Sequence, residues 1–166
     1  MKISVVIPCF NEIKTISEII KKIDKALNKY HFEVLVIDDF STDGSIELLK
    51  KIKLNNKNVR VLFNSKNLGK GASLRKGFDE VLGDIICIQD ADLEYDPDDL
   101  IPMIDLILNG SADVVIGSRF RGNGPVRASL FINRVANFII TNLTNIFTNL
   151  SLTDIECCYK VFKKDD

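Results

Sequence analysis

Short runs of β-branched residues alternate with longer segments of helical period along most of this chain, and this alternation constrains the fold most. The runs cover residues 3–7, 34–37, 59–63, 85–88 and 114–116, and the helical segments cover residues 16–27, 46–52, 74–82 and 98–108. Such alternation is typical of parallel α/β sheets, and continuous apolar runs suit strands that helices cover on both faces. We therefore predict an α/β fold with five strands in a Rossmann-like, mostly parallel sheet.

Length and composition limit the classes of protein that this chain can belong to. A chain of 166 residues is long enough for one domain with a hydrophobic core, so we predict a single domain over residues 1–166. Its 22 basic and 23 acidic residues nearly cancel, which gives no reason to expect a nucleic-acid surface. A single histidine and four cysteines without a CxxC pair argue against a zinc site, and they favour free thiols in a reducing, cytoplasmic setting.

The last third of the chain contains a glycine-rich loop and a long amphipathic segment. Residues 121–127 are predicted to form an exposed loop, followed by a helix over about residues 128–147. Its apolar face includes Phe138 and Leu143, and its polar stripe includes Asn137 and Thr141. The four asparagines within residues 135–153 argue against a membrane span. Two interpretations stay open: the helix lies in a membrane interface, or it packs on the core or on a partner chain.

Polar residues follow the first two predicted strands, where ligands bind in doubly wound sheets. They are Asn11, Glu12, Asp38 and Asp39, and Pro8 opens the first of these two segments. Carboxylates at neighbouring strand ends can accept hydrogen bonds from ribose hydroxyls and from a base N–H, which favours nucleoside recognition. The alternative interpretation is that Asn11 and Asp43 cap the helices that follow.

The third and fourth strands are followed by a candidate anion site and a candidate metal site. Lys70 lies in residues 67–71, where a helix is predicted to begin and where backbone N–H groups can bind an anion. A plain loop before a helix, without a ligand, explains this segment equally well. Asp90, Asp92 and Glu94 alternate after the fourth strand, and their mutual repulsion would be costly without a cation. Oxygen ligands of this kind suit Mg²⁺ or Mn²⁺, which would bridge nucleotide phosphates. The alternative is a solvated acidic turn.

Arginines and carboxylates near the end of the chain form a third group. Arg119 follows the fifth strand, Arg127 lies in the loop after it, and guanidinium groups bind phosphate oxygens in bidentate fashion. Asp154 or Glu156 could orient or deprotonate an acceptor. Solvated surface arginines and a structural aspartate at a turn are the competing interpretations.

Taken in order, these motifs resemble those of family 2 glycosyltransferases of the GT-A fold, specifically the polyprenyl- or dolichyl-phosphate sugar synthases. The motifs that carry the resemblance are residues 8–12, 38–44, 67–71, 90–97, 117–120 and 153–160. The resemblance implies a nucleotide site lined by Pro8, Asn11, Glu12, Asp38, Asp39, Lys70, Asp90 and Ala91. It implies Asp90, Asp92 and Glu94 as ligands of a divalent metal, Mg²⁺ or Mn²⁺. It also implies Arg119 and Arg127 at a lipid phosphate, with Asp154 close to the reacting centre.

The activity that the resemblance implies is an inverting, single in-line displacement at the anomeric carbon. The donor would be a nucleoside-diphosphate sugar of the GDP-mannose or UDP-glucose type, and the acceptor a polyprenyl or dolichyl phosphate, with peripheral contact at the cytoplasmic face of the membrane. Two alternatives stay open: a family 2 transferase with a polysaccharide or soluble acceptor, and a non-catalytic module that binds nucleotide sugars. A Rossmann-type oxidoreductase is disfavoured because no glycine fingerprint follows the first strand. Members of this family usually continue beyond the point where this chain stops, so we interpret the chain as a truncated or minimal catalytic domain.

Overall fold

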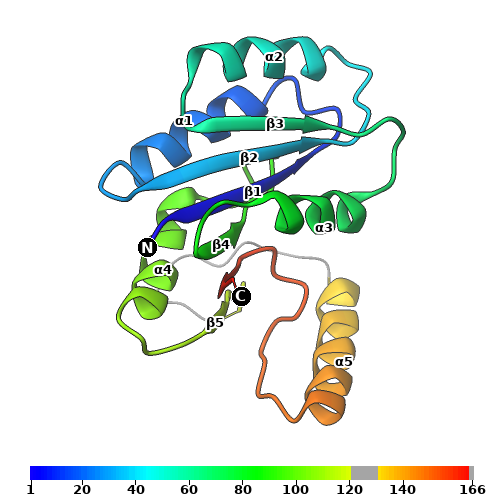
Figure 1. Cartoon of the computed structure of the whole chain (residues 1–166). Coiled ribbons are helices and arrows are strands. Elements are labelled where there is room, and N and C mark those ends of the chain that lie inside the picture. The colour runs from blue at the N-terminus through cyan, green and yellow to red at the C-terminus, as the bar shows by residue number, and fades with distance from the viewer. Residues whose placement is uncertain (121–130, 165–166) are drawn as a thin grey trace.

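A six-stranded sheet forms the centre of the molecule in the computed structural model, which describes residues 1–120 and 131–164 (Figure 1). The strands are β1 (Ile3–Cys9), β2 (Phe32–Asp38), β3 (Val59–Phe63), β4 (Ile85–Ile88), β5 (Val114–Ile116) and β6 (Lys160–Lys163). Their order in the sheet is β3-β2-β1-β4-β6-β5, and the four strands from β3 to β4 are all parallel. The predicted α/β class and the mostly parallel sheet are therefore confirmed.

Helices lie between the strands, largely where the helical period predicts them. They are α1 (Ile16–Ala26), α2 (Ser45–Asn55), α3 (Lys70–Glu80), the short 3₁₀ helix η1 (Pro97–Asp99), α4 (Leu100–Leu108) and α5 (Phe131–Thr148). Helices α1, α2 and α4 contribute to one buried cluster, and α3 packs on the opposite face of β1 and β2. Helices thus cover both faces of the sheet, as predicted. None of the helices in the described residues combines the length and apolar character needed to cross a bilayer.

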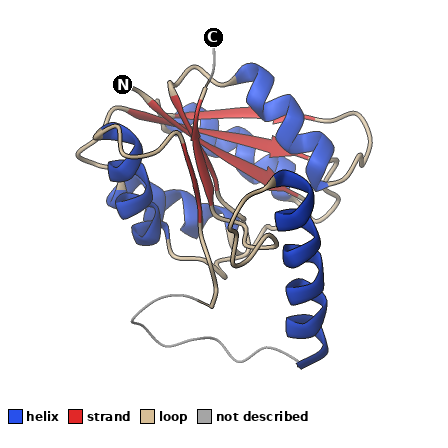
Figure 2. Ribbon diagram, turned by 90° about the horizontal axis from the view of Figure 1, so that it is seen from below, coloured by secondary structure: helices blue, strands red, loops and turns tan. Residues whose placement is uncertain are grey.

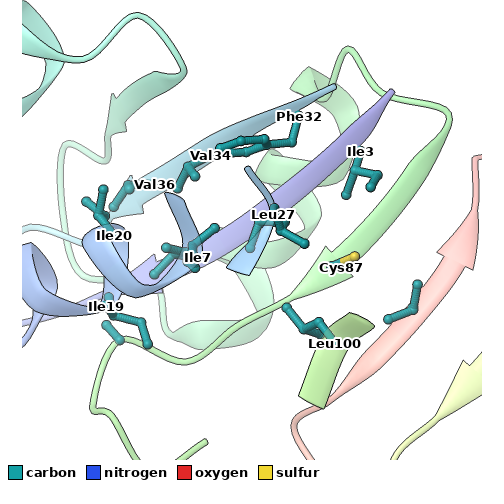
Figure 3. Close-up of a cluster of buried hydrophobic side chains, with 14 of the residues drawn as sticks. Ile3, Ile7, Ile19, Ile20, Leu27, Phe32, Val34, Val36, Cys87 and Leu100 are labelled. Carbon is teal, nitrogen blue, oxygen red and sulfur yellow. The ribbon is translucent and has the colours of Figure 1, made fainter. Parts of the chain in front are cut away.

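The main core lies between the sheet and helices α1 and α4 (Figure 3). Ile3 and Ile7 of β1 point into it, and they meet Ile19 of α1 and Leu100 of α4, all almost completely buried. Burying an aliphatic side chain of this size contributes about 1.5–3 kcal/mol, so this layer holds the strand ends in place. On the other face, α3 lies so close to the sheet that a Cβ at Gly77 would come within 2.6 Å of Val6 Cγ1.

The sixth strand is the main difference from the predicted sheet. β6 lies between β4 and β5 and is antiparallel to both. A four-residue run carries little strand signal of its own, and its direction depends on the loop that returns the chain to the sheet. The return places residues 154–159 beside the carboxyl end of β4.

Helix α5 turns its polar side toward the rest of the protein, whereas a helix that packs on the core would turn its apolar side inward. Its polar stripe faces the protein: Asn137 and Thr141 are buried, whereas Phe138 and Ile146 are 68% and 74% exposed. The returning chain binds this polar side, because Asn145 exchanges two hydrogen bonds with the backbone of Leu152 (2.8 and 2.9 Å). Figure 2 shows α5 standing beside the body of the molecule. The predicted helix is thus confirmed over residues 131–147, while residues 128–130 lie outside the described residues.

Candidate functional site

The carboxyl ends of β1, β2 and β4 and the first turn of α3 surround a pocket of about 230 Å³. Its walls are Pro8, Cys9, Phe10, Glu12, Asp39, Lys70, Ser73, Asp90, Ala91 and Asp92. Because parallel strands end at one edge of the sheet, residues far apart in sequence meet here. A larger, more open depression on α3, between Gly71 and Glu80, contains none of these strand-end carboxylates.

Asp39 forms one wall of the pocket and anchors the loop after β3. Its carboxylate accepts hydrogen bonds from Asn64 Nδ2 (2.7 Å) and from the backbone N–H groups of Leu68 (3.0 Å) and Gly69 (2.7 Å). Burial acts to raise the pKa of Asp39, but these hydrogen bonds outweigh it and lower the pKa below its ordinary value of 3.8. Asp39 therefore carries a negative charge at neutral pH and holds the start of α3 in position.

The loops after β1 and β2 are joined to each other by side-chain hydrogen bonds. Asn11 Oδ1 accepts from Thr42 N (2.8 Å), and Asp43 accepts from Ile13 N (3.0 Å) and from Ser45 N (3.0 Å). Asp43 thus binds the first residue of α2, but it is not the N-cap that the capping interpretation predicts, because that position is Gly44. Asn11 does not cap α1. Its own backbone is left-handed, with a φ of 58°, and its side chain binds the loop after β2 instead.

Lys70 and the acidic loop, residues 89–96, face each other across the pocket. Lys70 Nζ lies 2.5 Å from Asp90 Oδ1, and Asp92 Oδ1 accepts from Glu94 N (2.9 Å). Burial acts to lower the pKa of Lys70, but the hydrogen bond to Asp90 and the attraction of nearby negative charges, including Asp90 and Asp92, together outweigh it and raise the pKa. The ammonium group therefore neutralises part of the charge that the carboxylates bring together.

The donor set fits a divalent cation that is held jointly with a substrate. Among residues 1–120 and 131–164, no three His, Cys, Asp or Glu side chains are close enough together to hold a metal by themselves. Mg²⁺ and ions like it are commonly bound by one or two carboxylates together with substrate phosphates and water. Asp90 and Asp92 on the pocket wall supply such a pair. Glu94, the third predicted ligand, is exposed and is not among the pocket-lining residues.

Arg119 and Asp154 form a second group beside the acidic loop. Arg119 Nε and Nη2 each lie 2.8 Å from one oxygen of Asp154, and Arg119 N donates to the same carboxylate (2.9 Å). Burial acts to raise the pKa of Asp154, but these bonds outweigh it and lower the pKa below 3.8. Glu156 approaches Arg119 Nη2 at 3.4 Å. Asp154, only 1% exposed, thus fixes the guanidinium group, whose side chain remains 40% exposed.

The pocket unites most of the predicted nucleotide site. Asn11 and Asp38 are not among its walls: Asn11 braces a loop, and Asp38 is buried behind it, accepting from Ser41 N (3.1 Å). Arg127 lies outside the described residues. The wall residues that sequence reasoning missed are Cys9, Phe10 and Ser73. Phe10 and Cys9 lie inside the first strand-end motif, so their position carried the signal, whereas Ser73 reaches the pocket only through the packing of α3.

Comparison with known protein families decides where this chain belongs. The family model described as Glycosyl transferase family 2 matches residues 4–166, nearly the whole chain. The chain belongs to glycosyl transferase family 2. The resemblance found in the strand-end motifs is thereby confirmed.

Among the curated relatives of this family 2 chain are enzymes named for polyprenyl phosphates. It is 39% identical, over 76% of its length and 35% of the relative's, to a dolichol-phosphate mannosyltransferase of Pyrococcus furiosus. It is 25% identical, over 98% of its length and 48% of the relative's, to a dodecaprenyl-phosphate galacturonate synthase of Rhizobium johnstonii. The chain therefore spans half or less of the length of these relatives.

Solved structures show the same fold. Glucosyl-3-phosphoglycerate synthase from Mycobacterium tuberculosis, in complex with Mn²⁺, UDP and phosphoglyceric acid, superimposes with a TM-score of 0.71 at 22% identity, over 98% of this chain and 56% of that chain. A mannosyltransferase from Pyrobaculum calidifontis, in complex with GDP-mannose and Mn²⁺, gives a TM-score of 0.57 at 24% identity, over 68% of this chain and 34% of that chain. The predicted GT-A fold is confirmed.

Proposed function

We propose that this chain is the catalytic part of an inverting glycosyltransferase that moves a sugar from a nucleoside diphosphate to a polyprenyl or dolichyl phosphate. The observation that carries the proposal is the pocket in which Asp39, Asp90, Asp92 and Lys70 meet at the strand ends. The relatives named for dolichol and dodecaprenyl phosphates support the class of acceptor.

Each group of residues has a distinct task in this proposal. The walls around Pro8, Glu12 and Asp39 receive the nucleoside, and Lys70 and the acidic loop receive the diphosphate. Arg119, held by Asp154, faces the phosphate of the acceptor. The guanidinium fork matches two phosphate oxygens, and a phosphate acceptor is already anionic near neutral pH, so no strong general base is required. Arg127, the other arginine of the predicted acceptor site, lies outside the described residues, and its role stays a prediction.

Asp90 and Asp92 would hold a divalent cation, Mn²⁺ or Mg²⁺, together with the diphosphate. Such an ion supplies positive charge that stabilises the departing diphosphate. Two similar structures that contain Mn²⁺ with a nucleotide or nucleotide sugar support this choice of ion. The Lys70–Asp90 ion pair (2.5 Å) supports phosphate binding at this place, because the ammonium group could exchange the carboxylate for a phosphate oxygen.

Helix α5 supports peripheral contact with a lipid surface. Its outward residues are apolar and more than 45% exposed: Phe131, Ile132, Phe138, Ile139, Ile140, Leu143, Ile146 and Phe147. The helix has no acidic residue that anionic lipid would repel. Thr141 on its inner side accepts a hydrogen bond from Ile155 N (3.2 Å), next to Asp154. A membrane beneath α5 would therefore lie close to the group that receives the lipid phosphate. The cytoplasmic side of that membrane stays a prediction.

The test of the proposal is sugar transfer by the Asp92→Asn variant. Purified chain is given GDP-mannose or UDP-glucose, a polyprenyl phosphate and Mn²⁺, and labelled lipid product is measured. Losing one anionic ligand beside the developing charge should reduce turnover by at least about a hundredfold. The matched control is Asp98→Asn, the same change in η1 outside the pocket, which should retain turnover.

Three outcomes would contradict parts of the proposal. Unchanged turnover in Asp92→Asn rejects the metal role of the acidic loop. Transfer to a soluble phosphorylated acceptor but not to the lipid phosphate selects the alternative acceptor class. Absence of a melting-temperature shift with every GDP- or UDP-sugar, with and without Mn²⁺, rejects nucleotide-sugar binding, because a ligand that binds only the folded form raises the melting temperature.

A further inference from the structure

Tyr159 lies at the junction of the acidic loop and the Arg119 segment, although it contributes no wall to the pocket. It directly precedes β6 and is 3% exposed. Its hydroxyl lies 2.5 Å from the carbonyl oxygen of Asp96 and 3.0 Å from Gln89 Oε1, so its single proton is shared between these two acceptors. These two residues stand at the two ends of the acidic loop, so one side chain spans the base of the loop.

Gln89 extends this connection into the loop itself. It is completely buried, and its Nε2 donates to the carbonyls of Asp90 (3.2 Å) and Tyr95 (3.4 Å). The Tyr95 ring packs against the Tyr159 ring, with 4.9 Å between their centroids. Inside the loop, Leu93 has a φ of 64°, a conformation that costs free energy for a residue with a side chain. The buried contacts of Gln89 and Tyr159 hold the loop closed around this residue.

The backbone of Tyr159 reaches the other half of the site. Its carbonyl accepts from Gly117 N (2.9 Å), two residues before Arg119. A Cβ at Gly117 would lie 3.0 Å from Tyr159 Cβ and 3.1 Å from Cys157 Sγ, so the absence of a side chain there permits the close approach. Lys160 Nζ donates to the carbonyls of Ile155 and Cys157, which stiffens the segment that presents Tyr159.

We infer that Tyr159 is a positioning residue: its hydroxyl holds residues 90–96 in the conformation in which Asp90 and Asp92 face the pocket. The inference deepens the proposed function and rests on it only for the kinetic consequence. The order of the loop and its ability to bind an ion are properties that can be measured without a sugar donor or a lipid.

The test is Tyr159→Phe, which removes the hydroxyl and keeps the ring contact with Tyr95. Losing the hydrogen bonds at both ends of the loop should speed amide hydrogen exchange within residues 90–96 by at least about fivefold. Mn²⁺ titration in the presence of GDP or UDP, followed by electron paramagnetic resonance, should show a dissociation constant at least about threefold higher. In the transfer assay, the constants for Mn²⁺ and donor should rise, while the KM for the acceptor should not change.

Tyr30→Phe is the matched control, because it removes a hydroxyl in the loop after α1 that donates to Asp105 of α4 (3.0 Å), and neither residue lines the pocket. It should leave loop exchange and the Mn²⁺ constant unchanged. If Tyr159→Phe folds poorly, Gln89→Met removes the partner of the Tyr159 hydroxyl instead. It should likewise speed amide exchange in residues 90–96 and raise the Mn²⁺ dissociation constant.

Unchanged exchange in residues 90–96, or an unchanged Mn²⁺ constant, in the folded variant overturns the inference. So does an equal effect of Tyr30→Phe, because a general loss of stability would then explain the result. The two proposals can fail separately. If the wild-type chain transfers no sugar, the proposed function is rejected. If Tyr159→Phe still speeds exchange in the loop and weakens Mn²⁺ binding, the role of Tyr159 remains supported.

Discussion

Buried carboxylates in this molecule act mainly by holding other groups in place. Asp39 uses its oxygens to bind the backbone that leads into α3, and Asp154 uses its oxygens to orient Arg119. Both side chains are almost fully buried, and both have lowered pKa values because hydrogen bonds outweigh the effect of burial. A charge in such a place is stable only while its partners remain, so substitution of either residue disturbs the partner too.

Asp154→Asn is the residue-scale prediction. The amide cannot accept from Arg119 on both of its terminal atoms, so the guanidinium loses its fixed orientation. We expect kcat/KM for the acceptor to fall at least about tenfold, equivalent to about 1.4 kcal/mol, with the KM for the donor nearly unchanged. Steady-state kinetics with each substrate varied in turn measures the difference.

The control for this change is Asp113→Asn, which removes another aspartate that is paired with a cation. Asp113 pairs with Lys163 at 2.5 Å, but its side chain is 80% exposed, and exposed pairs contribute about 0–1 kcal/mol. Activity of this variant should equal that of the wild type. A KM for the donor that rises as much as the KM for the acceptor would show that Asp154 serves the nucleotide pocket instead.

Helix α5 raises the question of what covers its apolar side. The helix has an ordinary amphipathic pattern, but its polar side is occupied by the returning chain through Thr141 and Asn145. The apolar side is left outward, where exposed aromatic and aliphatic side chains form a continuous face. Contiguous faces of this kind mark sites of contact with proteins or membranes.

The element-scale prediction concerns vesicle binding by α5. Ile139→Ser combined with Ile146→Ser removes two apolar side chains from the middle of the outward face. Because burial of a side chain of this size contributes at least about 1.5 kcal/mol, the pair should weaken binding to phosphatidylglycerol-containing vesicles at least tenfold. Cosedimentation measures the bound fraction, and the melting temperature should stay near that of the wild type because both residues are exposed.

Leu54→Ser combined with Leu82→Ser provides the comparison, since these leucines are also more than half exposed but are not part of α5. This variant should bind vesicles like the wild type. If the α5 variant also binds normally, the lipid surface is the wrong occupant. If it instead converts a wild-type dimer to a monomer in sedimentation experiments, a second copy of the chain covers α5.

At the scale of the whole molecule, the ends of the sheet differ in chemistry. The carboxyl ends of the parallel strands carry the pocket, whereas the opposite end carries a structural ion cluster around Glu33. This buried carboxylate accepts from Ser4 Oγ (2.7 Å) and Leu82 N (2.7 Å) and pairs with Arg60 (3.1 Å). It joins β1, β2 and β3 to the segment before β4.

Acid sensitivity is the prediction that belongs to this scale. Burial acts to raise the pKa of Glu33, but hydrogen bonds from Ser4, Leu82 and Arg60 lower it below 4.5; Asp39, Asp43 and Asp154 are likewise lowered below 3.8. The unfolded chain therefore binds more protons in acid. The stability that these groups contribute is fully present above about pH 5 and is lost as the pH falls through the folded-state pKa values.

Urea unfolding between pH 3 and pH 7 measures this loss. Glu33→Gln should lower the free energy of unfolding at pH 7 by about 1–3 kcal/mol, because a buried acceptor network loses its charge. It should also flatten the slope below pH 4.5 by up to about 1.4 kcal/mol per pH unit. Asp99, whose pKa is raised by burial and by Asp96 and Asp98, opposes this trend. A slope in Glu33→Gln equal to that of the wild type would contradict the assignment.

Local sequence patterns determined the fold class and the approximate position of the site. Apolar runs and helical periods depend on neighbouring residues, and parallel strands end at a common edge, so motifs such as Asp90 and Lys70 could be predicted to meet. The order of these motifs also indicated the family, which the comparison confirmed.

Only the tertiary structure decided which partners satisfy each polar group. Periodicity shows that α5 has two faces but not that the returning chain covers the polar one. In the same way, the sequence places a carboxylate after a strand but not its partners, and long-range packing brought backbone N–H groups to Asp39 and Arg119 to Asp154. The antiparallel insertion of β6, which directly follows Tyr159, has the same cause, because hydrogen-bond partners distant in sequence meet only after the chain has folded.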